Sequence, residues 1–277
     1  MSESTRPSVL TTAATLALTA TTIATAITFC RVFPDWSFLG PFLVVAVAVH
    51  AVMAICRWQR WNVLVATVVG IAALAIVLGV LYYPDTLFGP LPTSATQNAA
   101  WQELADSFSL FGTTVAPVPS DGGYAVAIAL GVGICALLAD TFAFRFFGRI
   151  EAVVPSALLF ITAAALGTDR YRLSTAALWL TCVVVSIALL RAAHNEWSTA
   201  WLGSGARTRA VAVVTGGLTL SVVAMIAGVV IGPRLPGADA DALVDTRNRA
   251  GSSTTIVSPL VDVQARLVNR GRIDDTV

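Results

Sequence analysis

Long uncharged apolar runs, separated by short polar turns, fill most of the chain. Seven of them are predicted membrane spans: Val9–Phe29, Leu39–Ile55, Val63–Leu81, Tyr124–Ala139, Ile150–Leu166, Leu173–Leu190 and Ala210–Ile231. Each is close to the roughly 17–25 residues that a helix needs to cross a bilayer. The first run exceeds the roughly 7–15-residue apolar core of a cleaved signal peptide, so we interpret it as a retained span. The pattern predicts an all-α, polytopic membrane bundle.

One long loop, residues 84–123, interrupts the apolar runs and carries acidic but no basic side chains. Within it, Asn98–Phe111 has apolar residues at helical spacing opposite polar ones, which predicts an amphipathic helix. Its predicted apolar face consists of Trp101, Leu104, Phe108 and Phe111. We interpret this segment as a helix that lies on the outer membrane face or caps the bundle. A lid over a substrate site would give the same pattern.

The last 45 residues, from Pro233 to Val277, have a different composition, so we divide the chain into a transmembrane domain (1–232) and a tail (233–277). Gly237–Thr255 is acidic and rich in small residues, which is typical of a linker. Ile256–Val268 then alternates between apolar and polar positions, as a strand does. A lone strand is not stable in water. We therefore expect the tail to be a linker followed by the start of an incomplete extracytoplasmic domain.

The composition supports the membrane prediction and excludes some functions. Apolar residues make up 56% of the chain and charged residues only 12%, whereas soluble proteins have about a quarter charged residues. All 17 basic residues are arginine. Without lysine, the sequence has neither a retinal Schiff base nor a P-loop lysine.

The distribution of arginine predicts the orientation of the bundle. With the N-terminus inside, the cytoplasmic segments hold Arg6, Arg57, Arg60, Arg145, Arg149, Arg191, Arg207 and Arg209, and the short outer loops hold Arg31, Arg170 and Arg172. This bias is the one that the positive-inside rule requires. The turn Asp140–Arg149 is then a cytoplasmic hinge. We predict a multi-pass protein of the cell (inner) membrane, with its C-terminus outside.

Ionisable residues at membrane depth are the candidate functional groups, and the sequence offers two. Asp140 is predicted to form a structural ion pair with Arg145 or Arg149; a proton or ion site is the alternative. His50, within the second span, is predicted to make a buried hydrogen bond, with catalysis as the alternative. No zinc-protease, nucleotide-binding or nucleic-acid-binding pattern is present, and the four cysteines lack metal-ligand spacing. We expect no catalytic site, cofactor, metal or nucleic-acid partner.

Three stretches together resemble a known family. They are Ala139–Leu159, with the Arg145/Arg149 hinge and Val153-Val-Pro-Ser-Ala-Leu159; Ile231-Gly-Pro-Arg-Leu-Pro-Gly237; and Ser258-Pro-Leu-Val-Asp-Val263. The last is similar to the Asn-Pro-Leu-Val-Asp-Leu usual in the family. The chain thus resembles the N-terminal membrane domain of the actinobacterial TgpA-like, transglutaminase-related proteins.

The resemblance implies a helical membrane bundle followed by an extracytoplasmic transglutaminase-like domain with a Cys-His-Asp site. It also implies a MoxR-type ATPase as a neighbour and a role in envelope maturation. The sequence has no counterpart of the catalytic domain, so no catalytic residue is carried over. We expect a membrane anchor or scaffold without activity of its own, whose partners are the bilayer and a transglutaminase-like domain on a longer or separate chain. Two alternatives stay open: a transporter of small-molecule or lipid-linked substrates, and a seven-helix sensor.

Overall fold

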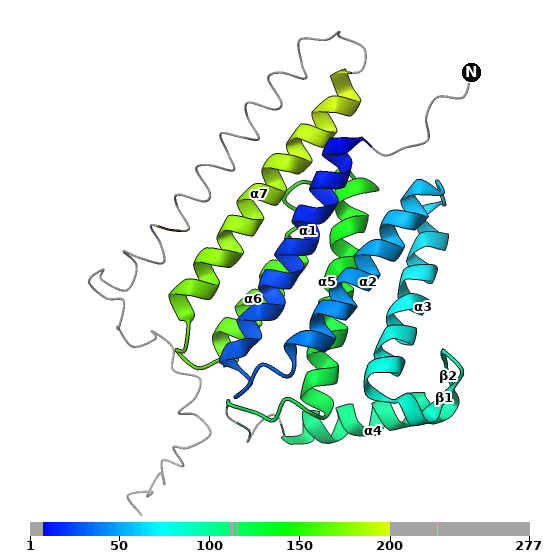
Figure 1. Ribbon diagram of the computed structural model, residues 1–277, viewed down its shortest axis with the longest axis vertical. Helices are drawn as coiled ribbons and strands as arrows, with labels where there is room; N and C mark the ends of the chain where they lie inside the picture. The colour runs from blue at the N-terminus through cyan, green and yellow to red at the C-terminus, as the bar shows by residue number, and fades with distance from the viewer. Residues whose placement is uncertain (1–7, 111–113, 115, 200–225, 227–277) are drawn as a thin grey trace, which may run out of the picture.

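The computed structural model describes residues 8–110, 114, 116–199 and 226. This part of the chain is almost entirely helical (Figure 1). Its main helices are α1 (Val9–Thr28), α2 (Leu39–Trp58), α3 (Val63–Tyr82), α4 (Ser94–Leu110), α5 (Gly123–Phe144), α6 (Val154–Leu166) and α7 (Arg172–Thr199). Short 3₁₀ turns, Phe29–Arg31 (η1) and Pro84–Thr86 (η2), and a two-stranded hairpin of β1 (Leu87–Phe88) and β2 (Leu91–Pro92) complete it. The predicted seventh span and the predicted tail lie outside the described residues.

Five of the described helices are long and apolar enough to cross a membrane: α1 with η1, α2, α3, α5 and α7. The first three begin where the sequence predicted. Ser8 and Asn62 cap α1 and α3, because each side-chain oxygen accepts a hydrogen bond from the backbone N–H three residues on. The predicted membrane bundle is confirmed at this level. The predicted count of seven spans is not established.

The predicted fifth span, Ile150–Leu166, is shorter than expected. Its helix, α6, begins at Val154 and has 13 residues, about 20 Å against about 30 Å of bilayer hydrocarbon. Pro155 explains this start, because proline is tolerated in the first turn of a helix but not further in. The residues just before α6 are turns, yet Ala152 and Val153 are buried. Irregular backbone at membrane depth needs such cover by protein.

Two other predicted boundaries are wrong. The fourth span was predicted to end at Ala139, but α5 continues through Asp140 to Phe144, and the turn begins only at Arg145. The sixth was predicted to end at Leu190, but α7 continues to Thr199. Arg191 and His194, predicted in a loop, therefore lie on α7.

Two sets of loop contacts define the two ends of the bundle. At one end, the N–H groups of Val118 and Thr168 both donate to carbonyls of the α1–α2 connection. This end also carries α4, so we call it the α4 end (Figure 1). At the other end, Arg145 Nη1 donates to the carbonyl of Trp61. We call this the arginine end, because Arg57, Arg60, Arg145 and Arg149 lie there. The connections α1–α2 and α6–α7 thus lie at the α4 end, and α2–α3 and α5–α6 lie at the arginine end, as the predicted order of loops requires.

Helix α1 lies at the centre of the bundle, where it packs against α2, α5, α6 and α7 (Figure 1). Small side chains allow this central position. Ala14, Ala26 and several threonines of α1 are fully buried, and small residues are typical of close helix contacts in membranes.

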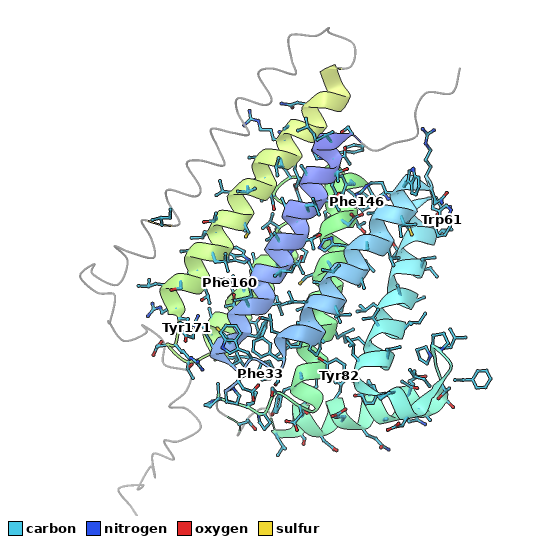
Figure 2. The ribbon with its side chains drawn as sticks, in the orientation of Figure 1. Phe33, Trp61, Tyr82, Phe146, Phe160 and Tyr171 are labelled. Carbon is cyan, nitrogen blue, oxygen red and sulfur yellow. The ribbon has the colours of Figure 1, made fainter. Side chains whose placement is uncertain are left out.

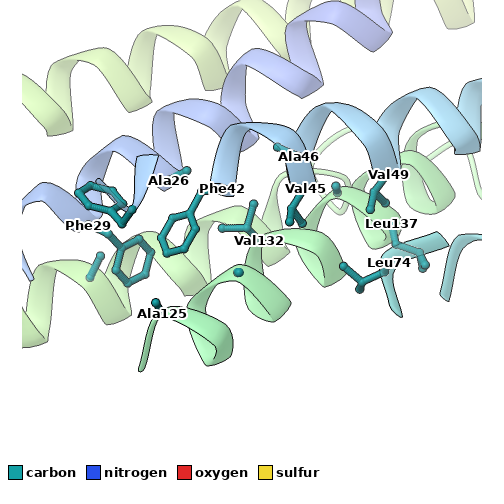
Figure 3. Close-up of a cluster of buried hydrophobic side chains, with 14 of the residues drawn as sticks. Ala26, Phe29, Phe42, Val45, Ala46, Val49, Leu74, Ala125, Val132 and Leu137 are labelled. Carbon is teal, nitrogen blue, oxygen red and sulfur yellow. The ribbon is translucent and has the colours of Figure 1, made fainter. Parts of the chain in front are cut away.

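The main hydrophobic core lies between α1, α2, α3 and α5 (Figure 3). Toward the α4 end it contains a group of aromatic rings, in which Phe29 and Phe42 meet edge to face with centroids 6.3 Å apart. Close helix contact continues at Gly133 of α5, where an added Cβ would lie 2.2 Å from the side chain of Leu74 on α3. The core therefore holds α2, α3 and α5 together beside α1.

Candidate functional site

A charged cluster joins three helices near the arginine end. Arg57 of α2 donates from Nη1 to Asp140 Oδ1 of α5 at 2.5 Å and from Nη2 to Thr15 Oγ1 of α1 at 2.7 Å. Its guanidinium carbon lies 3.8 Å from the centre of the Phe144 ring. The Asp140 side chain has no exposed surface and that of Arg57 is 18% exposed. Hydrogen bonds and a cation–π contact from two neighbouring helices, α1 and α5, thus hold the half-buried Arg57 cation of α2.

The predicted partners of Asp140 are therefore corrected. Arg145 and Arg149 were expected to pair with it, but the ion pair is made by Arg57. The cause is the continuation of α5 through Asp140, which directs the carboxylate into the bundle rather than into the turn. Arg145 instead binds the α2–α3 connection, and Arg149 is exposed.

Among the described residues, three buried polar atoms of this region have no hydrogen-bond partner: Asp140 Oδ2 and the Nε and Nη2 atoms of Arg145. Arg57 thus bonds one oxygen of a buried carboxylate, and the described residues supply no hydrogen bond to the other. This unpaired oxygen is the feature that distinguishes the cluster from a fully satisfied structural pair.

His50 of α2 lies deep within the bundle and is 1% exposed. Its Nε2 is 3.0 Å from Thr22 Oγ1 of α1, whereas Nδ1 has no partner. The predicted buried hydrogen bond of His50 is thus present. In the described part of the chain, His50 belongs to no group of three or more histidine, cysteine or carboxylate side chains that could hold a metal ion.

The threonines of α1 make two kinds of hydrogen bond. Most donate to the carbonyl one turn back in their own helix, as Thr22 does to Leu18, which removes an unpaired hydroxyl from the apolar layer. Thr25 also accepts from the indole of Trp179 at 3.0 Å, and Thr21 lies 2.8 Å from Ser186. With Thr15 and Thr22, these contacts connect α1 to α2 and α7. The sequence pattern did not indicate this second role.

The amphipathic segment of the outer loop is a helix, and it lies across the α4 end of the bundle (Figure 1). Of its predicted apolar face, Leu104 is half-buried, whereas Trp101 and Phe108 are 74% and 68% exposed. Phe111 lies outside the described residues. The apolar face is thus only partly used within the chain, which is what a helix at a membrane interface would show.

Glu103 makes two of the contacts that hold α4 on the bundle. The hydroxyl of Tyr83, just after α3, donates to Glu103 Oε2, and burial together with this bond raises the pKa of Tyr83 above its ordinary value. At the start of α5, an added Cβ on Gly123 would lie 2.3 Å from the backbone oxygen of Glu103. Helix α4 therefore rests directly on the backbone of α5, and only glycine leaves room for it.

A signal for the Arg57–Asp140 pair was present in the sequence. The predicted topology places both residues at the cytoplasmic ends of their spans, at similar depth, and Arg57 is the basic residue nearest to the apolar run of α2. A lone acid and a lone base at one depth are expected to pair because an unpaired charge there is costly. The prediction instead paired Asp140 with Arg145 or Arg149, which are close to it in the sequence.

The chain matches the TgpA N-terminal domain over residues 20–274. No curated protein and no solved structure has a significant match to it. The matched residues cover nearly the whole chain, from the second half of α1 through the predicted tail. This agrees with the resemblance that the hinge, the exit of the last predicted span and Ser258–Val263 indicated. The chain therefore belongs to the TgpA N-terminal domain family.

Proposed function

We propose that this chain is the membrane anchor and scaffold of a transglutaminase-like protein of the cell envelope. In this role the bundle holds an extracytoplasmic module at the membrane surface and performs no reaction itself. The module is carried either on a longer form of the chain or on a separate polypeptide. The proposal includes an N-terminus in the cytoplasm, α4 on the outer face, and residues 233–277 as the connection to the module.

One observation carries the scaffold role: the ionisable side chains Arg57, Asp140 and His50 make hydrogen bonds between helices. The Arg57 guanidinium contacts both Asp140 and Thr15, and His50 contacts Thr22. A carrier needs polar groups that a substrate or ion can reach in turn from the two sides of the membrane. Groups bonded between neighbouring helices serve rigidity instead.

A second candidate function is an ion- or proton-coupled carrier in which Asp140 is the coupling group. The observation in its favour is the buried Asp140 Oδ2, to which no residue that the structure describes makes a hydrogen bond. A carboxylate with an unused oxygen at membrane depth is a possible proton acceptor, because such residues mark proton relays in transporters. The bond of Oδ1 to Arg57 opposes this function, because it commits the carboxylate to joining α2 and α5.

The variant Asp140→Asn separates the two functions. It keeps the size of the side chain but removes its charge and its ability to release a proton. A scaffold loses stability or assembly and shows no transport phenotype. A carrier loses coupled uptake in vesicles loaded with equal amounts of folded protein. Arg149→Gln is a matched control, because it removes an exposed charge near the same end of the bundle.

A MoxR-type ATPase is the proposed cytoplasmic partner, and the arginine end is the surface that it would meet. The turn between α5 and α6 exposes Phe146, Phe147 and Arg149 there. This part of the proposal rests on the family resemblance. Cross-linking from a photoreactive residue placed at Phe147 in intact membranes tests it, with the same residue at Trp101 of the α4 end as the control.

A further inference from the structure

A pocket opens on the side of the bundle at the α4 end, between the last turns of α1 and the first turns of α7. Its volume is about 230 Å³, and its walls are Ile27, Cys30, Trp36, Tyr171, Ser174, Thr175 and Leu178. Most of these residues are apolar or aromatic. The hydroxyl of Thr175 donates to the carbonyl of Tyr171 and is thus used within its own helix. The pocket therefore offers few polar groups to an occupant.

The position of the pocket indicates which medium surrounds it. Ile27 and Cys30 belong to the membrane-spanning α1–η1 segment, and Ser174, Thr175 and Leu178 belong to the membrane-spanning part of α7. Trp36 and Tyr171, 45% and 49% exposed, lie at its outer edge, with their rings 6.5 Å apart. Such aromatic pairs are typical of the level of the lipid headgroups. Figure 2 shows Tyr171 at the α4 end, where the chain enters α7.

Arginine side chains surround the same edge. The guanidinium carbon of Arg170 lies 4.9 Å from the centre of the Tyr171 ring, and its Nη1 donates to the Pro34 carbonyl at 3.3 Å. The described residues accept no hydrogen bond from the other N–H groups of Arg170, so these groups can donate to a ligand. Arg172, the first residue of α7, is also exposed. Arg31 is buried, and it donates from Nε to the Thr168 carbonyl at 2.8 Å.

Among the described residues, three carboxylates lie near this edge: Asp35, Asp169 and Asp121, the last next to Ser120, which bonds Ser37. Asp35 accepts hydrogen bonds from the backbone N–H and the hydroxyl of Ser37, and Asp169 has its own partner. The cation of this edge that can meet a ligand is therefore Arg170, which stacks on Tyr171, a pocket wall, and has donors that the described residues leave unused. An apolar pocket with a cationic edge at headgroup level matches the two parts of an anionic lipid.

We propose that this pocket holds one acyl chain of an anionic phospholipid, with the lipid phosphate bound by Arg170. The acyl chain lies between α1 and α7, and the phosphate lies beside Tyr171 in the outer leaflet of the proposed orientation. The pocket lies at the α4 end, whereas the Arg57–Asp140 cluster lies near the arginine end, so the two sites are separate. A bound lipid would fill the contact between α1 and α7 at the end of the bundle that faces the proposed extracytoplasmic module.

Native mass spectrometry of the full chain, released from nanodiscs of equal parts phosphatidylglycerol and phosphatidylcholine, tests the site. Ser174→Trp places an indole in the pocket from an exposed position and is expected to abolish retention of the bound lipid. Arg170→Gln is expected to lower the ratio of retained phosphatidylglycerol to phosphatidylcholine about fivefold, the effect of one surface arginine on an anionic lipid.

Two controls make the result specific. Leu180→Trp adds the same indole to an exposed position of α7 that is not a pocket wall, and Arg149→Gln removes an arginine at the other end. Both are expected to retain lipid as the unchanged chain does. Equal retention in all variants would overturn the proposal. So would a change from dimer to monomer with Ser174→Trp at constant lipid content, because a second copy of the chain would then be the occupant.

Discussion

Arg57 Nη1 and Asp140 Oδ1 lie 2.5 Å apart although 83 residues separate them in the sequence. This pair joins α2 to α5, and the bond from Arg57 to Thr15 adds α1. It lies near the arginine end of the bundle, where α5 is still helical. The ion pair therefore holds together the three helices at the centre of the fold.

Breaking this pair from one side should be costly. Asp140→Asn or Arg57→Gln leaves a charge without its partner, and we expect a loss of about 3–5 kcal/mol in the free energy of unfolding. The double variant Arg57→Met/Asp140→Leu removes both charges and should recover most of that loss. Chemical unfolding in mixed micelles measures the difference. If the double variant loses as much free energy of unfolding as the two single variants lose together, the pairing is contradicted.

The contact between His50 and Thr22 gives a second test of the polar links from α1. Thr22→Val keeps the shape of the side chain but leaves His50 Nε2 without its partner, so we expect a loss of about 1–3 kcal/mol. Thr19→Val is the control, because the Thr19 hydroxyl bonds within α1 to the Thr15 carbonyl. Thermal unfolding midpoints of the two variants should differ, with the Thr22 variant the lower. Equal midpoints would mean that the bond does not stabilise the bundle.

Gly123 should be the residue on which the position of α4 depends. A Cβ there would meet the backbone oxygen of Glu103 at 2.3 Å, and backbone cannot move aside as a flexible side chain can. Gly123→Ala should release α4, which faster amide hydrogen exchange over Ser94–Leu110 would reveal. In contrast, an added Cβ on Gly40 of α2 meets nothing within 4 Å. Gly40→Ala should leave exchange in α4 unchanged.

The docking of α4 should weaken at high pH. Burial, and next the hydrogen bond to Glu103, raise the pKa of Tyr83 in the folded state, so the folded protein holds this proton more tightly than the unfolded chain. The stabilisation is fully present below the ordinary tyrosine pKa of about 10 and is lost as the pH rises through the folded pKa. Tyr83→Phe should remove this dependence. Protection factors in α4, corrected for the pH dependence of intrinsic amide exchange, that stay constant to high pH in the unchanged chain would contradict the assignment.

The sequence predicted the long helices well because each apolar run is bounded by strong signals. Asn62 caps the start of α3, and the aromatic Tyr82-Tyr83 pair with Pro84 ends it. The ends of α5 and α7 were missed for a shared reason. Residues such as Asp140 and Arg191 were interpreted as marking the edge of the membrane, but a helix continues through a charged residue when its side chain finds a partner or reaches the headgroups.

The shortened α6 shows a different limit. The apolar run Ile150–Leu166 predicts a full span. Hydrophobicity does not separate its first residues from the helix, because a turn that is buried by protein has apolar side chains as a helix does. Pro155 was visible in the sequence, but only the packing of Ala152 and Val153 shows that the preceding segment is covered.

The candidate site was predicted in part. The sequence indicated Asp140 and His50 as the buried polar groups and predicted a hydrogen bond for His50. It did not indicate Arg57, Thr15 or Thr22 as partners, because contacts between helices depend on their relative rotation. Apolar residues on almost every face of these spans leave that rotation undefined in the sequence.

The most direct test of the anchor role is the connectivity of the native protein. Antibodies against α4 would capture the chain from membranes of the source organism after cross-linking, and mass spectrometry would identify what is attached. The account predicts a Cys-His-Asp transglutaminase-type domain, either continuous with residues 233–277 or cross-linked to them in equal amount. A chain recovered from intact membranes without any such domain would contradict the account and favour the carrier function.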